Sequence, residues 1–255
     1  MKLLIRQEQK EQIEGRRKPL VISEEKIYYV EDTSKDFHCS DGVIKKEELQ
    51  KTGLIQSNKG KSFLALDSQF IDKYRHIRKT AQTIPLKDIG FIIAETGINK
   101  DSVVVDSGAG SGGSACFIAR HAKYVYSYDI SEVNIDQTKK NIEYFGLTNI
   151  EVSNADIYSQ IPAKNVDVIL LDVPEPWKAL QSVNNSLKIG GFVVAYCPQI
   201  IQSQEFVNAA TNIGFMNVKS VEIIERDWKI EGNIVRPRSL STIHSGFITI
   251  MRKIN

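Results

Sequence analysis

The apolar residues of this chain change their spacing near residue 75. From Tyr74 onward, continuous apolar runs that suit buried parallel strands alternate with longer segments of helical period. The strands predicted by this pattern are 103–106, 124–129, 150–153, 166–171, 191–197, 218–225 and 246–252. The helices predicted between them are 86–97, 114–122, 131–145, 178–188 and 203–213. This alternation predicts an α/β fold with a doubly wound sheet.

The ends of these elements carry suitable residues. Ser131 is suited to cap the helix that follows 124–129, and Gly146 and Gly214 are suited to end theirs. The last two strands are separated only by 226–245, with no helix between them. We therefore expect a seven-stranded sheet whose final pair is antiparallel.

The first 75 residues have a different pattern. Short β-like runs at 20–22, 27–30, 43–44 and 62–66 are separated by Asp, Gly, Asn and Lys residues, without helical periodicity beyond the charged start. The sequence thus predicts two domains, a small β-rich one over 1–75 and the α/β one over 76–255.

A glycine-rich turn joins the first two strands of the α/β domain. The apolar run from Val103 ends at Asp106, the turn 107–113 contains four glycines, and the next strand ends at Asp129. Glycines allow a tight turn and a close approach to a ligand, and an acid at the second strand end can bind two ribose hydroxyls. The segment predicts a nucleoside-bearing cofactor, and the alternative is a glycine turn without a ligand.

The acids decide which cofactor is favoured. Gly108, Gly110 and Gly113 also satisfy the dinucleotide pattern GxGxxG, but Asp106 would repel a pyrophosphate and suit a cation or an amino group. S-adenosylmethionine carries a sulfonium and an α-amino group and no phosphate. Asp156 follows the apolar 150–152 and is placed to take the adenine amino group. S-adenosylmethionine is therefore preferred to a nicotinamide cofactor.

A second motif, Asp-Val-Pro-Glu-Pro-Trp at 172–177, follows the buried run 168–171. It places Asp172 at the carboxyl end of the fourth strand, over the cofactor pocket. The two prolines deny the loop backbone donors and predict a rigid lip instead of a helix. Beside a methyl donor, Asp172 could accept a hydrogen bond from an exocyclic amine; the alternative is a helix cap. Trp177 is expected to pack rather than to stack on a base.

Composition narrows the class further. The 255 residues are 42% hydrophobic and 25% charged, which is ordinary for a soluble globular protein, and no apolar run approaches the length of a membrane span. The apolar core of the N-terminus is too short for a secretory signal. A net charge of +2 requires any nucleic-acid binding to depend on local patches. Cys39, Cys116 and Cys197 lack metal-ligand spacing and suit reduced cytoplasmic thiols, with an intersubunit disulfide as the alternative in a thermophile.

Four motifs together resemble the family of tRNA adenine-N1 methyltransferases that modify the T loop, particularly its archaeal members. They are Asp-x-Pro-x-Pro at 172–176, Arg-Pro…His-x-Gly-aromatic at 236–247, Phe-His-x-x-x-Gly-x-Ile at 37–44, and Arg…Gln…Lys-Asp at 78–88. The likeness begins near residue 20 and extends to the end of the chain. It implies a class I, Rossmann-like methyltransferase fold, methylation of T-loop adenine 58 (with 57 as a second target), a cytoplasmic homotetramer, and no metal.

The resemblance and the residue pattern together define the candidate site. Asp172 is the expected catalytic residue. It would hold the N6 amine of an adenine turned out of the tRNA, while N1 of that adenine, which has an in-plane lone pair, attacks the sulfonium methyl group of the cofactor. The expected cofactor-binding residues are Asp106, Gly108, Gly110, Ser111, Gly112, Gly113, Ser114, Asp129, Asn134, Asp156 and Gln82. The expected phosphate contacts are Lys87, Arg236 and Arg238, whereas His244 is expected to be structural.

The chain also departs from the family pattern. Pro85 stands where the family has an aromatic or histidine against the target adenine, and Asp106 and Asp129 replace glutamates. Because the glycine loop and the ribose acid remain, a degenerate subunit without cofactor is not expected. Two alternatives stay open: a protein carboxyl methyltransferase of the isoaspartyl type, and a non-catalytic tRNA-binding subunit.

Overall fold

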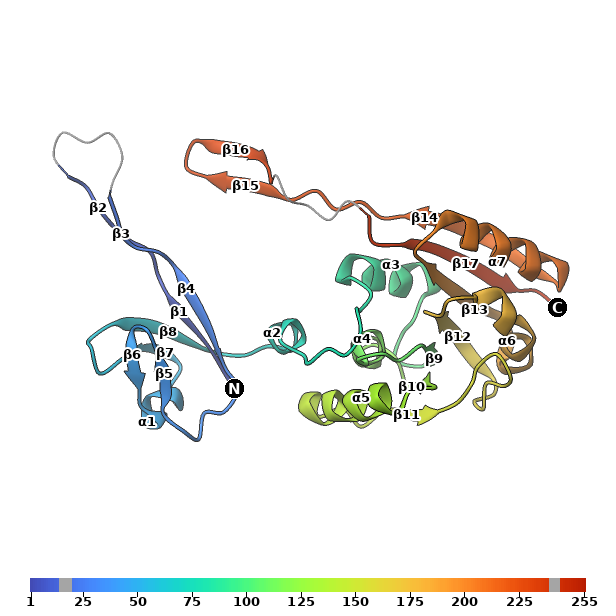
Figure 1. The fold of residues 1–255 in the computed structure, drawn as a ribbon, viewed down its shortest axis with the longest axis horizontal. Coiled ribbons are helices and arrows are strands. Elements are labelled where there is room, and N and C mark those ends of the chain that lie inside the picture. Colours follow the sequence, from blue (N-terminus) through green and yellow to red (C-terminus); the bar gives the residue numbers. More distant parts are fainter. Residues whose placement is uncertain (14–19, 239–243) are drawn as a thin grey trace. The chain divides into compact units, whose positions relative to one another are not determined.

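The structure is a computed structural model that describes the chain except for residues 14–19 and 239–243. It divides into two compact units, an N-terminal unit, Met1–His76, and a C-terminal unit, Ile77–Asn255 (Figure 1). No helix among the described residues is long and apolar enough to cross a membrane.

The C-terminal unit is built on a seven-stranded sheet of order β11-β10-β9-β12-β13-β17-β14. Its strands are β9 (Val103–Ser107), β10 (Tyr124–Asp129), β11 (Ile150–Asn154), β12 (Val166–Leu171), β13 (Leu187–Cys197), β14 (Phe215–Glu222) and β17 (Phe247–Lys253). β9 to β13 are parallel, and β17 lies antiparallel between β13 and β14. The predicted doubly wound sheet with an antiparallel final pair is confirmed.

Helices cover both faces of this sheet. They are α3 (Leu86–Thr96), α4 (Gly113–Ala119), α5 (Glu132–Phe145), the 3₁₀ turn η1 (Pro176–Ala179), α6 (Leu180–Ser186) and α7 (Ile200–Asn212). In Figure 1, α3, α4 and α5 lie on one side of the strands, and α6 and α7 lie on the other. The largest apolar core includes Ile169, Val193, Phe206 and Met251, all fully buried. At about 1.5–3 kcal/mol for each large buried side chain, this core fixes the strand ends on which the site is built.

Several predicted boundaries were wrong. The lip after Asp172 is not free of helix, because η1 begins at Pro176, where the missing proline N–H is not needed. α7 begins at Ile200 because Gln199 and Gln202 form a capping box. Ser131 occupies the N-cap position of α5, but its side chain makes no cap hydrogen bond, whereas Gly146 ends the helix in the left-handed conformation as predicted.

The segment between β14 and β17 contains a hairpin that the sequence pattern did not predict. Its strands, β15 (Trp228–Glu231) and β16 (Ile234–Pro237), pair antiparallel and form a separate two-stranded sheet (Figure 1). The register places Trp228 opposite Pro237 and Ile230 opposite Val235, so these four share one face, which we call the apolar face of the hairpin. Three of them are 52–72% exposed.

The N-terminal unit is β-rich, as expected, around a four-stranded sheet of order β4-β1-β8-β7. The strands of the whole unit are β1 (Lys2–Arg6), β2 (Gln9–Glu11), β3 (Leu20–Ser23), β4 (Lys26–Val30), β5 (Phe37–Cys39), β6 (Gly42–Ile44), β7 (Gly53–Gln56) and β8 (Ser62–Asp67), of which β2 with β3 and β5 with β6 form separate two-stranded sheets. It also contains two helices that were not predicted, α1 (Lys46–Leu49) and α2 (Phe70–Arg75). Both are short, which leaves little room for a 3.6-residue pattern to be detected.

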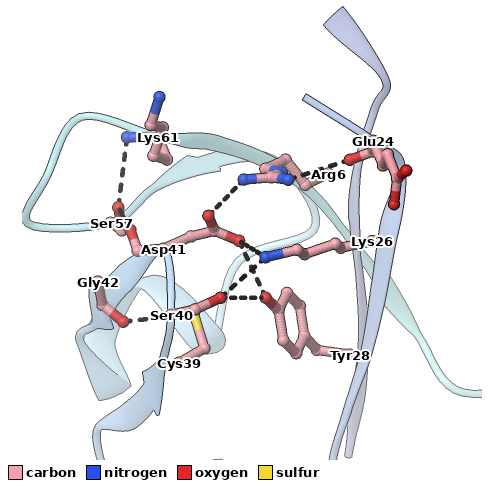
Figure 2. Close-up of polar contacts among 10 residues, drawn as sticks. All are labelled: Arg6, Glu24, Lys26, Tyr28, Cys39, Ser40, Asp41, Gly42, Ser57 and Lys61. Atoms are coloured by element: carbon pink, nitrogen blue, oxygen red, sulfur yellow. Dashed lines mark hydrogen bonds and ion pairs between the residues drawn. The ribbon is translucent and has the colours of Figure 1, made fainter. Parts of the chain in front are cut away.

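A polar cluster joins the strands of this unit (Figure 2). The Arg6 guanidinium pairs with the Asp41 carboxylate, and both side chains are about nine-tenths buried. Tyr28 donates to the same carboxylate at 2.9 Å, and Ser57 donates to the Asp41 carbonyl at 2.8 Å. The next residue, Gly42, has a φ of +116°, and a Cβ there would lie 2.6 Å from Asn58 Oδ1. The glycine of the 37–44 motif is thus required by the packing of this turn.

The three cysteines are free thiols. Burial raises the pKa of Cys116 to about 12 and that of Cys197 to about 11. Both side chains are enclosed in the C-terminal unit, at 0% and 1% exposure, so neither can reach a partner chain for an intersubunit disulfide.

Candidate cofactor and catalytic site

A pocket of about 350 Å³ opens at the carboxyl ends of β9, β10, β11 and β12. It is lined by Gly108, Tyr128, Asp129, Ile130, Ala155, Asp156, Ile157, Tyr158, Asp172, Val173 and Pro174. Four predicted site residues, Gly108, Asp129, Asp156 and Asp172, therefore meet in one cavity. The carboxyl edge of a parallel sheet is the usual ligand side of such folds.

The glycine loop serves the packing of the chain itself. Gly108 has a φ of +84°, and a Cβ there would lie 2.1 Å from the backbone oxygen of Asp172. Gly112 has a φ of +73°, and its Cβ would lie 2.7 Å from Thr138 Cγ2. Only glycine fits these positions, because the loop passes directly over the end of β12 and against α5. These two glycines are explained without a ligand.

Asp129 holds the same loop from the end of β10. Its carboxylate accepts the Gly110 N–H at 2.9 Å, the Ser131 N–H at 2.9 Å and the Asn134 Nδ2 amide at 3.1 Å. A carboxylate offers about four lone-pair positions, so one remains for a ligand hydroxyl on the pocket side. Asn134 thus orients Asp129 and does not line the pocket.

Other predicted cofactor residues lie around the pocket and not on its wall. Ser111, at 1% exposure, accepts the N–H groups of Thr80 and Ala81 at 2.8 and 3.1 Å and so fixes the segment before the exposed Gln82. Gly113 and Ser114 form the buried first turn of α4. The predicted residues absent from the pocket wall are Asp106, Gly110, Ser111, Gly112, Gly113, Ser114, Asn134 and Gln82.

Asp106 is buried below the glycine loop. Its side chain is 2% exposed and accepts a hydrogen bond from Ser127 Oγ at 2.8 Å. Burial, and to a smaller extent the charges of Asp172 and Asp129, raise its pKa to about 7, although the Ser127 hydrogen bond lowers it. The prediction that Asp106 faces a cofactor cation directly is not supported by the pocket lining, because Asp106 lies beneath the wall and not on it.

Asp172 is the open carboxylate of the site. Its backbone N–H is fixed by the Ser107 carbonyl at 2.9 Å. Within the described part of the chain, no group donates a hydrogen bond to its carboxylate, and burial raises its pKa to about 6. The alternative that Asp172 caps the following helix is wrong, because Glu175 occupies the N-cap position of η1. An acceptor without a partner is left facing the pocket.

Hydrogen bonds connect the residues of the remaining pocket wall. Asp156 accepts the Tyr158 N–H and the Ser159 hydroxyl, each at 3.0 Å, and closes the turn after β11. The Tyr158 hydroxyl in turn accepts the Glu175 N–H at 3.2 Å. Trp177 packs against the main apolar core, as predicted. The loop after Asp172 is therefore held from the adenine side of the predicted cofactor site.

The predicted phosphate contacts have different surroundings. Lys87 is a correction: its ammonium donates to Asp88, Ile223 and Ser245 at 2.6–2.7 Å, so none of its three N–H groups is left for a phosphate. Arg236, on β16, and Arg238, just after it, are exposed.

His244 and Pro85 have structural positions. Both ring nitrogens of His244 face acceptors, Glu222 Oε1 at 2.5 Å and the Pro198 carbonyl at 3.1 Å. The Glu222 hydrogen bond raises the pKa of His244, and the ring links the end of β14 to the segment after β13, in line with the structural interpretation of this residue. Pro85 is the N-cap residue of α3.

Tyr196 is a residue of this region that the sequence reasoning missed. It lies on β13, and since Leu171 of β12 pairs with Ala195, Asp172 and Tyr196 are the next residues on adjacent strands. Burial, and then the carboxylates of Asp88 and Asp172, raise its pKa. The sequence contained one indirect signal of this contact, the glycine of the C-terminal motif. Gly246 packs against the Tyr196 ring, where a Cβ would lie 2.6 Å from Tyr196 Cζ.

Among the described residues no group of His, Cys, Asp and Glu is arranged to hold a metal ion. The strand order and the antiparallel β17 define the class I, Rossmann-like fold of S-adenosylmethionine-dependent methyltransferases, with an acid-lined pocket at the carboxyl ends of the strands. Residues 75–247 match the family model described as the tRNA methyltransferase complex GCD14 subunit, and the chain belongs to this family.

Similar proteins agree with this assignment. The chain is 29% identical, over 92% of its length and 94% of the relative, to the tRNA (adenine(57)-N(1)/adenine(58)-N(1))-methyltransferase TrmI of Methanocaldococcus jannaschii. Its fold is similar to a SAM-dependent O-methyltransferase of Thermotoga maritima (TM-score 0.82, 24% identity, 100% of this chain and 93% of that one). It is also similar to the tRNA (m1A58) methyltransferase TrmI of Aquifex aeolicus (TM-score 0.78, 22% identity, 100% and 97%). The predicted family and fold class are confirmed.

Proposed function

We propose that this chain transfers a methyl group from S-adenosylmethionine to N1 of adenine 58 in the T loop of tRNA, with adenine 57 as a second target. The observation that carries the proposal is the Asp172 carboxylate, which lies on the wall of the pocket with no donor from the described residues. The family supports tRNA as the substrate, and the M. jannaschii relative supports both positions. The small β-rich domain over 1–75 and the methyltransferase domain over 76–255 complete the proposed organisation.

The pocket residues fit the proposed cofactor. Asp129 would accept from a ribose hydroxyl with its one remaining lone pair, Asp156 would face the adenine amine, and the buried Asp106 would favour a positive charge nearby. The carboxylates on and below the wall suit a sulfonium and would oppose a pyrophosphate. When bound, the cofactor supplies an electrophilic methyl group.

The role of Asp172 follows from the chemistry of the base. N1 of adenine has an in-plane lone pair, so the protein has to orient the base more than to remove a proton. Asp172 would accept a hydrogen bond from the N6 amine and turn N1 toward the methyl group. With a pKa of about 6, the carboxylate is ionised at neutral pH and would stabilise the cation that forms on the base. The adenine must leave its place in the folded tRNA to reach this position.

Contacts with the rest of the tRNA are proposed for the β15–β16 hairpin. Arg236 and Arg238 are exposed at its C-terminal side and would contact phosphates. A basic contact of this kind positions the RNA without reading its sequence.

We also propose that the chain acts in the cytoplasm as a homotetramer. The apolar face of the hairpin supports assembly, because a two-stranded sheet that exposes Trp228, Ile230 and Val235 is marginally stable alone. A second copy of the same face would cover these exposed side chains. Analytical ultracentrifugation of Ile230→Glu should show a smaller species than the parent, and an unchanged sedimentation coefficient would refute this contact.

The proposed reaction has a direct test. An unmodified tRNA transcript is incubated with protein and S-adenosylmethionine, digested to nucleosides and examined by mass spectrometry, with a transcript carrying guanosine at position 58 as the control. 1-Methyladenosine is expected in the first transcript. Its absence, under conditions where calorimetry shows bound cofactor, would defeat the proposal, and methylation of an isoaspartyl peptide would favour the carboxyl methyltransferase.

A further inference from the structure

The chain leaves the central sheet after β14 and returns to it at β17, and one buried side chain contacts both ends of this excursion. The Lys87 ammonium, at the start of α3, donates to the Ile223 carbonyl and to the Ser245 hydroxyl, each at 2.6 Å. Ile223 directly follows β14, and Ser245 lies two residues before β17. Lys87 therefore fixes the base from which the β15–β16 hairpin extends.

The neighbouring Asp88 closes this arrangement into a ring. Its carboxylate, at 0% exposure, accepts from Lys87 at 2.7 Å on one oxygen and from Ser245 Oγ at 2.7 Å on the other. Ser245 thus accepts from Lys87 and donates to Asp88. We call Lys87, Asp88 and Ser245 the clamp. Every donor of Lys87 is used, and a buried charge pair satisfied in this way is costly to open.

The clamp also holds the residue beside Asp172. The Tyr196 hydroxyl donates to Asp88 Oδ2 at 3.1 Å, and the ring packs so closely on Gly246 that a side chain there would overlap it. Tyr196 and Asp172 follow paired residues on adjacent parallel strands. The Tyr196 side chain, on the strand adjacent to the one that Asp172 follows, is consequently fixed by Asp88 of α3 and by Gly246, just before β17.

We propose that the clamp is a positioning device for methyl transfer, which holds Tyr196 and the base of the β15–β16 hairpin in a fixed relation to Asp172. This inference rests on the proposed function. Lys87 and Asp88 do not face the pocket, so they act through Tyr196 and the hairpin base and not on the substrate. Because this link is rigid, the placement of the target adenine beside Asp172 depends on the segment that carries Arg236.

Ser245→Ala is the informative substitution, because it removes two hydrogen bonds of the clamp without burying an unpaired charge. Ser245→Thr keeps the hydroxyl and serves as the conservative rescue. Ser220→Ala is the matched control, since Ser220 accepts from Thr249 at 3.2 Å within the β14–β17 pair and touches no clamp residue. Tyr196→Phe removes the bond to Asp88 and keeps the ring.

The readouts are the single-turnover methylation rate at saturating cofactor and tRNA, the cofactor affinity by calorimetry, and the melting temperature. Ser245→Ala and Tyr196→Phe should lower the saturated rate about tenfold, as expected when loss of a positioning hydrogen bond misaligns the reacting groups. Cofactor affinity should stay within about twofold, and Ser245→Thr and Ser220→Ala should keep about the parental rate.

The outcomes separate the two proposals. A Ser245→Ala protein with the parental saturated rate overturns the clamp, even if its melting temperature falls, because the bonds then serve stability alone. Failure of Ser245→Thr to restore the rate overturns it as well. A parent protein that binds cofactor and leaves the transcript unmodified overturns the proposed function and this inference together. If Tyr196→Phe does not fold, the Ser245 series decides.

Discussion

Replacement of Asp172 is the perturbation that tests the proposed chemistry most directly. Because the carboxylate receives no hydrogen bond from the described residues, Asp172→Ala removes no internal bond, and the backbone N–H to Ser107 remains. The fold should therefore survive. Loss of one preorganised electrostatic contact to developing charge typically costs about 10²–10³ in rate. We expect a loss of that size for Asp172→Ala, and a smaller one for Asp172→Asn, whose carbonyl still accepts a hydrogen bond but carries no charge.

The pH dependence supplies a second measure of the same group. Burial raises the pKa of Asp172 to about 6, and the ionised form is the active one. The parental rate should rise with pH, reach half its plateau near that value and be about tenfold lower one unit below it. Asp172→Asn should lack this titration, while its residual rate stays nearly level across the same range.

The assay is single-turnover transfer of labelled methyl to the tRNA transcript at saturating cofactor, with tRNA affinity measured separately by filter binding. Saturation is needed because Asp172 also lines the cofactor pocket. The expected order of rates is Asp, Asn, Ala, with tRNA affinity changed little. A parental rate in Asp172→Ala, or a rate order with Ala above Asn, would refute the assignment of N6 binding to this carboxylate.

Three further outcomes are expected. Asp129→Ala should lose cofactor affinity by about 1.5–3 kcal/mol per lost hydroxyl contact, and Asp129→Asn less; equal calorimetric titrations of all three proteins would contradict ribose binding. Burial raises the Asp106 pKa from 3.8 to about 7, so its contribution to stability is complete below about pH 4 and is lost as the pH rises through 7. Chemical denaturation should show Asp106→Asn gaining up to about 4 kcal/mol over the parent at pH 8 and little at pH 4, and a pH-independent difference would argue against a buried titration. Arg236→Ala with Arg238→Ala should weaken tRNA binding and reduce the slope of log affinity against log salt by about 2; an unchanged slope would remove these residues from the phosphate contacts.

The sequence predicted the strands best where both faces of the strand are buried. The runs at 103–105 and 168–171 are entirely apolar because both faces of the sheet are covered, so the strand ends, and the acids Asp106 and Asp172 that follow these runs, could be placed within a residue or two. The hairpin at 228–237 escaped because its strands alternate an apolar face with a charged one and its turn is a single Gly-Asn pair, too short a pattern to stand out within 226–245.

The candidate site was predicted as a set of residue types, but not as a set of contacts. Asp129, Asp156 and Asp172 follow from strand ends, which converge in any such sheet. The role of Lys87 does not follow, since a lysine at a helix start is usually solvated, and its partners Ile223 and Ser245 are far along the chain. Tyr196 was missed because the pairing of β12 with β13 shifts register between Val166 and Val168, which no local pattern reveals.

A side chain at position 108 would overlap the Asp172 carbonyl, and this limits what the presence of a glycine at this position can tell about other members of the family. Any substitution at Gly108 would push the loop off the end of β12 and move Asp172, whether or not a cofactor is used. A relative that has lost methyl transfer but still folds would keep this glycine for its architecture. In comparisons among paralogues, loss of activity should therefore be sought at Asp172, whose carboxylate accepts no hydrogen bond from the described residues and which the fold can spare more readily than the glycine.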